Sequence, residues 1–217
     1  MNEPPVLISF IVAQVFGLLA VICIIVASVM DNDSTAGVDA AVARFVWHPV
    51  VMTLGLVYLF GCSAVVYRVL KSLDKLPAKI IHAFIHFVAL VLGAVGLYFA
   101  ITAKNALNVD HFNTVHGLFG LTTLILFALQ WLISLPVFLW PKAPDSIRAP
   151  GLVVHVCVGV AVFLLASATA FTGLNFKSGT TKSSDPFYKA SAFFYFCYDI
   201  VILFMVTLKE YKRPPDY

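Results

Sequence analysis

Four histidines are the side chains of this sequence whose spacing best suits chemistry. His48, His82, His116 and His155 each stand near the start of an apolar run long enough to cross a bilayer, with successive gaps of 34, 34 and 39 residues. A neutral imidazole in hydrocarbon costs several kcal/mol unless its lone pair and its N–H both find partners. Haem iron is the partner that fits four such side chains.

The composition identifies the kind of protein that must position these histidines. The chain has 217 residues, of which 61% are hydrophobic and only 12% are charged, so we predict an integral membrane protein rather than a soluble domain. The first apolar run lacks the basic segment of a signal peptide and is predicted to be a retained span. The four cysteines form no CxxCH pattern, which excludes covalently attached c-type haem. We expect membrane lipid around the chain and no nucleic-acid partner.

Hydropathy predicts an all-α polytopic membrane protein with six transmembrane helices. The predicted spans are residues 7–30, 47–69, 79–103, 115–139, 152–175 and 190–208. Each is long enough for a hydrocarbon core of about 30 Å at about 1.5 Å per residue. Loops rich in Pro, Gly, Asn and Asp separate them, and Pro77 and Pro150 are expected in those loops. Residues 1–217 therefore form a single domain around a central four-helix bundle.

The distribution of cationic side chains predicts the orientation. An even number of spans places both termini on one side, where nine of the 14 Lys and Arg residues fall: Arg68, Lys71, Lys75, Lys79, Lys142, Arg148, Lys209, Lys212 and Arg213. The other five fall on the opposite side. By the positive-inside rule, both termini are expected to be cytoplasmic.

The parity of the spans divides the four histidines into two pairs. Spans two and four both begin on the non-cytoplasmic side, so His48 and His116 lie at one depth. Spans three and five begin on the cytoplasmic side and bring His82 and His155 to another depth. Two ligands from two helices suit a planar macrocycle in a bundle, whereas zinc needs three or four converging ligands. Taken singly, each histidine is more commonly a hydrogen-bonded structural residue.

Four stretches of sequence resemble the cytochrome b561 family. They are WHPVVMTLGLVYLFGCSAVVYR (47–68), KIIHAFIH (79–86), FGLTTLILFALQW (119–131) and IRAPGLVVHVCVG (147–159). The resemblance covers roughly residues 47–177 and implies a haem-binding core with two non-covalent haem b groups. It also implies that His48 and His116 ligate the non-cytoplasmic haem and that His82 and His155 ligate the cytoplasmic one, the pairing that parity gives.

Four cations form a second candidate site at the cytoplasmic surface. Arg68, Lys75, Lys79 and Arg148 are predicted to converge beside the His82 and His155 haem. Ascorbate is a monoanion at neutral pH and haem propionates are anions, so either can be held by Arg and Lys side chains. The resemblance implies ascorbate-binding or propionate-binding cations here. The alternative is that these charges only orient the chain in the membrane.

Three further side chains carry weaker signals. His86 follows His82 by one helical turn, which matches a two-ligand zinc pattern, but a hydrogen bond in the core or at a haem edge is favoured. His111 lies beside Asp110 in a non-cytoplasmic loop, where it is a candidate for binding the electron acceptor or a metal ion; a solvated loop residue is the alternative. Asp199 lies within the sixth span, so it is either functional or a protonated acid bonded to a neighbouring helix.

The resemblance implies an ascorbate-dependent oxidoreductase of the monodehydroascorbate reductase or ferric reductase type. We expect one-electron transfer from cytosolic ascorbate, through two haems, to monodehydroascorbate or ferric iron on the far side. The expected membrane is lysosomal, late endosomal or that of a secretory vesicle, with the plasma membrane as the alternative, and a homodimer is compatible with this assignment. Two other hypotheses remain: a proton or solute transporter with a histidine relay, and a haem membrane anchor that passes electrons to a quinone or partner subunit.

Overall fold

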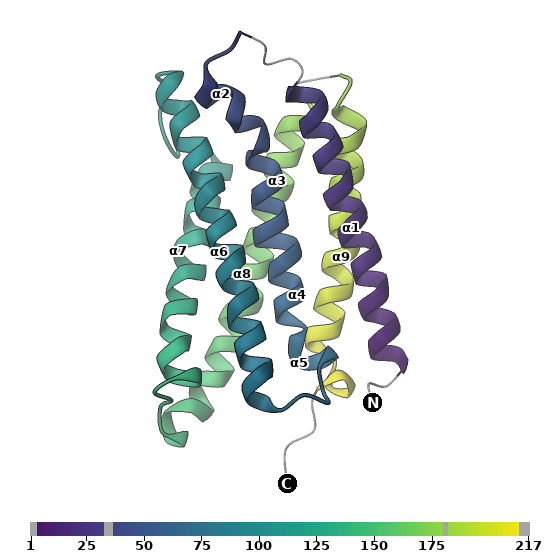
Figure 1. Cartoon of the computed structure of the whole chain (residues 1–217), viewed down its shortest axis with the longest axis vertical. Coiled ribbons are helices and arrows are strands. Elements are labelled where there is room, and N and C mark those ends of the chain that lie inside the picture. The colour runs from purple at the N-terminus through teal and green to yellow at the C-terminus, as the bar shows by residue number, and fades with distance from the viewer. Residues whose placement is uncertain (1–3, 33–36, 180–181, 213–217) are drawn as a thin grey trace.

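The structure is a computed structural model that describes residues 4–32, 37–179 and 182–212. Within these ranges all regular elements are helical, and six helical stretches are long and apolar enough to cross a membrane. The six stretches run side by side in one bundle (Figure 1). The predicted all-α, six-span architecture is therefore confirmed, while Arg213, one of the nine cations counted above, lies outside the described residues.

Five of the spanning stretches are built on one long helix each. Their bounds are α1 (Pro4–Asn32), α6 (Lys75–Ala106), α7 (Val115–Ser134), α8 (Asp145–Ser178) and α9 (Asp185–Thr207), with the short η4 (Leu135–Leu139) completing α7 and η5 (Lys209–Tyr211) following α9. The helices α1, α6 and α8 extend past the predicted apolar run at both ends, and α9 begins before its predicted run. A helix satisfies its own backbone hydrogen bonds, so it continues into the polar surface layer beyond the apolar run.

Two prolines that were expected in loops lie inside helices instead. Pro77 occupies the first turn of α6, where the missing N–H has no helical partner in any case. Pro150 lies in the second turn of α8, where it gives up one backbone hydrogen bond near the helix start. The prediction that Pro77 and Pro150 mark loops is wrong, because proline near a helix N-terminus costs little.

The second spanning stretch is segmented. It consists of α2 (Ala40–Arg44), η2 (Phe45–Trp47), α3 (His48–Thr53), η3 (Leu54–Leu59), α4 (Phe60–Ala64) and α5 (Val66–Val69). The segment η3 is a π-helical turn, and such turns are frequent at functional sites. Gly55 in this turn packs so close to α6 that a Cβ there would lie 2.9 Å from the Ala89 carbonyl oxygen. The segmented span thus packs tightly against α6.

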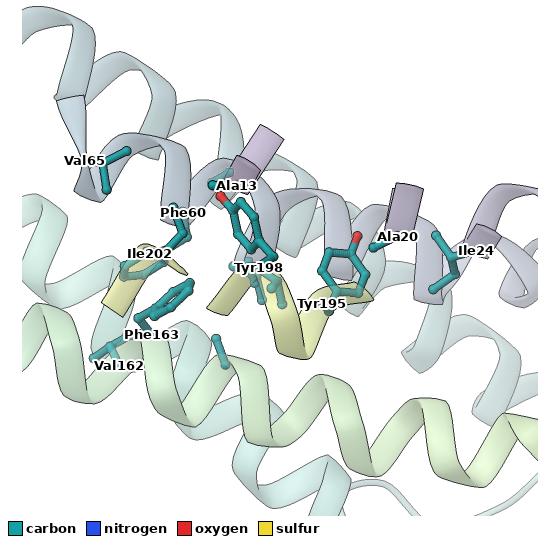
Figure 2. Packing of buried hydrophobic residues seen from close by; sticks show 14 of the residues in the cluster. Ala13, Ala20, Ile24, Phe60, Val65, Val162, Phe163, Tyr195, Tyr198 and Ile202 are labelled. Carbon is teal, nitrogen blue, oxygen red and sulfur yellow. The ribbon is translucent and has the colours of Figure 1, made fainter. Parts of the chain in front are cut away.

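The first and last spans pack against each other beside the four that carry the histidines (Figure 1). Figure 2 shows Tyr195 and Tyr198 of α9 on the side that faces α1. The Ser191 hydroxyl of α9 donates to the Ala20 carbonyl of α1 at 2.9 Å, and the Tyr198 hydroxyl donates to the Tyr58 carbonyl of η3 at 2.6 Å. These contacts join α1 and α9 to the central four-helix bundle.

Both ends of the described chain lie at the same end of the bundle (Figure 1). The Tyr211 hydroxyl, in η5, donates to the Pro5 carbonyl in α1 at 3.4 Å. At the opposite end, the Asp31 carboxylate of α1 forms an ion pair with Lys177 of α8 at 3.3 Å and accepts a hydrogen bond from the Tyr188 hydroxyl of α9 at 2.9 Å. The Tyr211–Pro5 contact therefore marks the end of the bundle that holds both termini, and the Asp31–Lys177 ion pair marks the opposite end.

Candidate functional site

The first histidine pair lies at the end of the bundle that carries α2. His48 begins α3 directly before Pro49, and Thr114 caps the N-terminus of α7 by accepting from the Gly117 N–H at 3.1 Å, which places His116 in the first turn. The ring centroids of His48 and His116 lie 6.1 Å apart, with 79° between the ring planes. Two metal–imidazole bonds of about 2.0 Å, each continued by about 1 Å to the ring centre, span about 6 Å. One metal ion fits between these rings.

The second pair lies toward the other end of the bundle. His82 of α6 and His155 of α8 also have ring centroids 6.1 Å apart, with 70° between their planes. The Gly96 carbonyl that accepts from His48 comes fourteen residues after His82 on α6, and the Thr169 carbonyl that accepts from His116 comes fourteen residues after His155 on α8. At about 1.5 Å per residue, both helices separate the two pairs by about 21 Å.

All four imidazoles use Nδ1 for a hydrogen bond. In the first pair, His48 Nδ1 donates to the Gly96 carbonyl at 2.8 Å, and His116 Nδ1 donates to the Thr169 carbonyl at 3.0 Å. A carbonyl can only accept, so these rings carry their proton on Nδ1 and leave the Nε2 lone pair available. Metal-bound histidines typically show this arrangement, because the hydrogen bond fixes the tautomer and the ring orientation.

The second pair is oriented by two serines, and the Ser63 carbonyl fixes the Nδ1 proton of His82. His82 Nδ1 lies 2.9 Å from the Ser63 carbonyl oxygen and 3.1 Å from the Ser63 hydroxyl oxygen. His155 Nδ1 lies 2.9 Å from the Ser134 hydroxyl oxygen. The sequence did not predict Ser63 and Ser134 as histidine partners, because nothing in their local pattern indicates which histidine they approach. Their only sequence signal is that each is a polar residue within an apolar span.

The space beside the first pair is large enough for a flat cofactor. A cavity with an empty volume of about 860 Å³, counting its open mouth, is lined by His48, His116 and mostly apolar side chains. Binding sites for organic cofactors commonly have volumes in this range. The site fits haem, because two facing imidazoles with available Nε2 atoms border an apolar cavity. Across the described ranges, no group of three or more His, Cys, Asp or Glu side chains is arranged to hold a metal ion by itself.

His86 is buried in aromatic side chains between the two pairs. Its ring centroid lies 4.5 Å from that of His82, 4.8 Å from that of Phe60 and 5.2 Å from that of Phe127. The residue is 8% exposed, and its Nδ1 has no hydrogen-bond partner. The zinc pattern that His82 and His86 resemble in sequence does not acquire a third ligand in the described structure.

Two of the other three predicted cytoplasmic cations lie within electrostatic range of Lys79. Lys79 is near Lys75 and Arg148, and also near Lys142, which is not one of the four predicted cations of this site. The Lys79 ammonium donates to the Phe138 carbonyl at 2.9 Å, and Arg148 forms an ion pair with Asp145. A group of cations held near one histidine pair can bind a small anion.

The fourth predicted cation, Arg68, has a different set of partners. Its guanidinium donates to the Val206 carbonyl at 2.6 Å and to the Leu208 carbonyl at 3.5 Å, which are at the C-terminal end of α9. Helix carbonyls at this end have no partner within the helix, and a cation there is favoured by the helix dipole. Arg68 thus secures the end of the last span.

His111 lies at the mouth of the cavity beside the first pair. Its Nε2 is 2.8 Å from the Asn105 Oδ1, and both His111 and Lys104 line the cavity. The Lys104 ammonium donates to the Asp110 carbonyl at 2.6 Å and to the Asn113 Oδ1 at 3.3 Å. These bonds hold a cation and an imidazole beside the opening, where a soluble molecule can approach.

Comparisons with known proteins show which family and which relatives this sequence resembles. Residues 47–180 match the model of the family described as eukaryotic cytochrome b561. The chain is 33% identical to the Xenopus tropicalis protein named plasma membrane ascorbate-dependent reductase CYBRD1, over 97% of this chain and 78% of that protein. It is 30% identical to the Mus musculus lysosomal membrane ascorbate-dependent ferrireductase CYB561A3, over 94% of this chain and 91% of that protein. A Zea mays protein named ascorbate-specific transmembrane electron transporter 1 is 38% identical over 58% of this chain and 53% of its own length.

Proposed function

The chain belongs to the eukaryotic cytochrome b561 family, and we propose that it transfers single electrons across a membrane from ascorbate, through two haem b groups, to an acceptor on the far side. One observation carries the proposal: two pairs of facing histidines, each with ring centroids 6.1 Å apart, lie near opposite ends of one membrane-spanning bundle. The names of relatives that match most of the chain support ascorbate as the donor.

In this proposal His48 and His116 hold the non-cytoplasmic haem, and His82 and His155 hold the cytoplasmic one. Haem supplies the capacity to hold one electron at each site. The protein supplies the axial ligands, fixes their orientation through the Nδ1 hydrogen bonds and excludes water with apolar side chains. His86, Phe60 and Phe127 fill the interior next to the second pair, so the two sites are joined by packed side chains. Transfer then requires no moving part.

The donor site is proposed at the cytoplasmic surface, at Lys75, Lys79 and Arg148. Ascorbate carries one negative charge, and the nearby cations can attract it and orient it with charge-assisted hydrogen bonds. Arg68 adds positive charge to the same surface while it secures α9. This assignment requires both termini to be cytoplasmic, as the distribution of Lys and Arg predicts.

The acceptor site is proposed at the mouth of the cavity beside His48 and His116. Lys104 and His111 border this opening and provide a cation and an imidazole. Monodehydroascorbate or ferric iron is the proposed acceptor, and one of the relatives is named a ferrireductase. The proposed location is a lysosomal, late endosomal or secretory-vesicle membrane, and the plasma membrane is the alternative that another relative's name supports.

The proposal is tested by the visible spectrum and the haem content of the purified protein. We expect reduced-minus-oxidised haem b bands that ascorbate alone produces, and ascorbate inside liposomes should reduce a ferric chelate outside. His48→Ala and His116→Ala should remove the same spectral component, and His82→Ala and His155→Ala the other. If His48→Ala and His82→Ala removed the same spectral component, the proposed pairing would be contradicted. Absence of haem bands would favour a proton or solute transporter instead.

A further inference from the structure

An acidic side chain lies in the interior of the last span, away from both histidine pairs. Asp199 is in α9 and is only 6% exposed. Neither of its carboxyl oxygens has a hydrogen-bond partner in the structure. An ionised carboxylate in such surroundings is very costly, so an acid placed there must either hold a proton or lie next to a compensating charge. Neither the histidine ligands nor the surface cations explain why this position is acidic.

The groups around Asp199 are neutral at physiological pH. On α9 itself, Tyr195 and Tyr198 are in electrostatic contact with the carboxyl group, and Tyr198 in turn contacts Tyr58 of η3 and Cys62 of α4. The α1 helix contributes the Gln14 amide, which bonds to Tyr58 at 2.7 Å. Figure 2 shows Tyr195 and Tyr198 in this packed region. These neighbours supply no positive charge, so an ionised Asp199 would depend on the net positive charge that an oxidised haem at the first histidine pair would carry.

Ser167 of α8 faces Asp199, and its hydroxyl can form a hydrogen bond with either protonation state of the carboxyl group. Ser167 donates to the Phe163 carbonyl of its own helix at 3.0 Å, which leaves its oxygen able to accept a hydrogen bond from a protonated Asp199. If Asp199 loses its proton, rotation of the same hydroxyl lets Ser167 donate to the carboxylate. Ser167 can thus accompany the gain or loss of a proton without backbone movement.

Residues of α8 lie between Asp199 and the cavity of the first histidine pair. Ser167 faces Asp199, while its neighbours Ala166, Thr169 and Ala170 line the cavity. The Thr169 carbonyl also accepts the hydrogen bond from His116. The thickness of a helix with its side chains is about 10 Å, so the carboxyl group lies about that far from the cavity.

We propose that Asp199 is a proton-binding site that takes up one proton when the non-cytoplasmic haem site receives one electron. The inference rests on the proposed function. The electron comes from the cytoplasmic haem site, and the proton comes from the aqueous phase and converts the Asp199 carboxylate to a carboxylic acid. When the acceptor removes the electron, Asp199 returns the proton to water. Charge in the apolar interior therefore stays balanced in both states.

The size of the coupling follows from Coulomb's law. A unit charge about 10 Å away, at an effective dielectric constant of about 20, changes proton affinity about ten- to twentyfold. Asp199 should therefore bind a proton about ten to twenty times more tightly when the non-cytoplasmic site is reduced. The midpoint potential of that site should depend on pH over a window of about one pH unit.

The test is redox-difference infrared spectroscopy of the haem-loaded protein in nanodiscs, with visible spectra of the same samples. In the wild-type protein, reduction should produce the C=O band of a newly protonated carboxylic acid, and an indicator dye should report proton uptake. Asp199→Asn should lose the band and the uptake. Asp185→Asn, which changes an acid on the same helix that pairs with Lys189, should keep both.

A second variant tests the role of Ser167, and the wild-type spectra can overturn the inference. Ser167→Ala removes the hydroxyl that would donate to the carboxylate, so Asp199 should stay protonated and the band should disappear from the difference spectrum. Wild-type protein that ascorbate reduces normally, but that shows no carboxyl band on reduction, would overturn the inference and leave the proposed function intact. Protein without haem bands would overturn both.

Discussion

The backbone of Gly173 on α8 lies directly against the His116 ring of α7. A Cβ on Gly173 would come within 2.7 Å of the imidazole Cε1 and 3.1 Å of its Nδ1. Contacts of this length do not occur without displacement, so the absent side chain at Gly173 allows His116 to face His48.

Gly173→Ala should therefore displace the His116 ring and weaken the non-cytoplasmic haem site while leaving the cytoplasmic one intact. The haem-to-protein ratio after purification should fall from about two toward one. Gly151→Ala is the control, because a Cβ there meets its nearest neighbour, Phe138, at an ordinary 3.7 Å. Full haem content in Gly173→Ala would show that the bundle adjusts around the extra methyl group.

Ser134 and Ser63 should differ in their importance for the cytoplasmic haem. The Ser134 hydroxyl is the partner found for His155 Nδ1, whereas His82 Nδ1 keeps the Ser63 backbone carbonyl when the Ser63 hydroxyl is removed. Loss of such an orienting partner typically weakens metal binding about 10- to 100-fold. Ser134→Ala should release haem to a haem-scavenging protein faster than Ser63→Ala does. Equal release rates would contradict an orienting role for the Ser134 hydroxyl.

Lys79 should contribute to ascorbate binding through its charge. Lys79→Gln keeps an N–H donor for the Phe138 carbonyl but removes the positive charge, so the fold of this region should be retained. Losing one charge-assisted contact of about 1.5–3 kcal/mol predicts an apparent affinity about ten- to hundredfold weaker.

Stopped-flow reduction in nanodiscs, titrated with ascorbate at two salt concentrations, measures this effect. Lys71→Gln is the control, because Lys71 is expected only to orient the chain. The haem content and the dithionite-reduced spectrum should be unchanged in both variants. Wild-type kinetics and salt dependence in Lys79→Gln would mean that ascorbate binds elsewhere.

Asp31 and Lys177 should stabilise the end of the bundle that lies opposite the two termini. The Asp31 side chain is 5% exposed and that of Lys177 is 21% exposed, so Asp31→Asn removes the carboxylate that pairs with a largely buried ammonium. Breaking a buried ion pair costs about 3–5 kcal/mol, and the partial exposure of Lys177 places the expected loss in the free energy of unfolding near about 2–3 kcal/mol.

Thermal unfolding in detergent should show this loss. Asp110→Asn is the control, because Lys104 bonds to the Asp110 backbone carbonyl rather than to its side chain. The double variant Asp31→Asn with Lys177→Met should recover much of the stability, because it removes the ammonium and keeps an amide oxygen that can accept from the Tyr188 hydroxyl. Equal unfolding temperatures for Asp31→Asn and the wild type would contradict a stabilising ion pair.

The sequence by itself determined the six spans and the grouping of the histidines. Apolar runs of sufficient length must form helices in a membrane, because a helix satisfies its own backbone hydrogen bonds there. Once the spans alternate in direction, the position of each histidine along its span assigns it to one end of the bundle. His48 with His116, and His82 with His155, follow from that geometry without knowledge of which helices touch.

Only the tertiary structure decided the partners that these side chains use. Ser134 bonds to His155, Arg68 bonds to the carbonyls that end α9, and Asp31 pairs with Lys177, in each case across a long separation in the sequence. Hydropathy identifies a span but not its rotation about its own axis. The rotation is set by the packing of neighbouring helices, such as the contact between Gly173 and His116, and it determines which polar side chains meet.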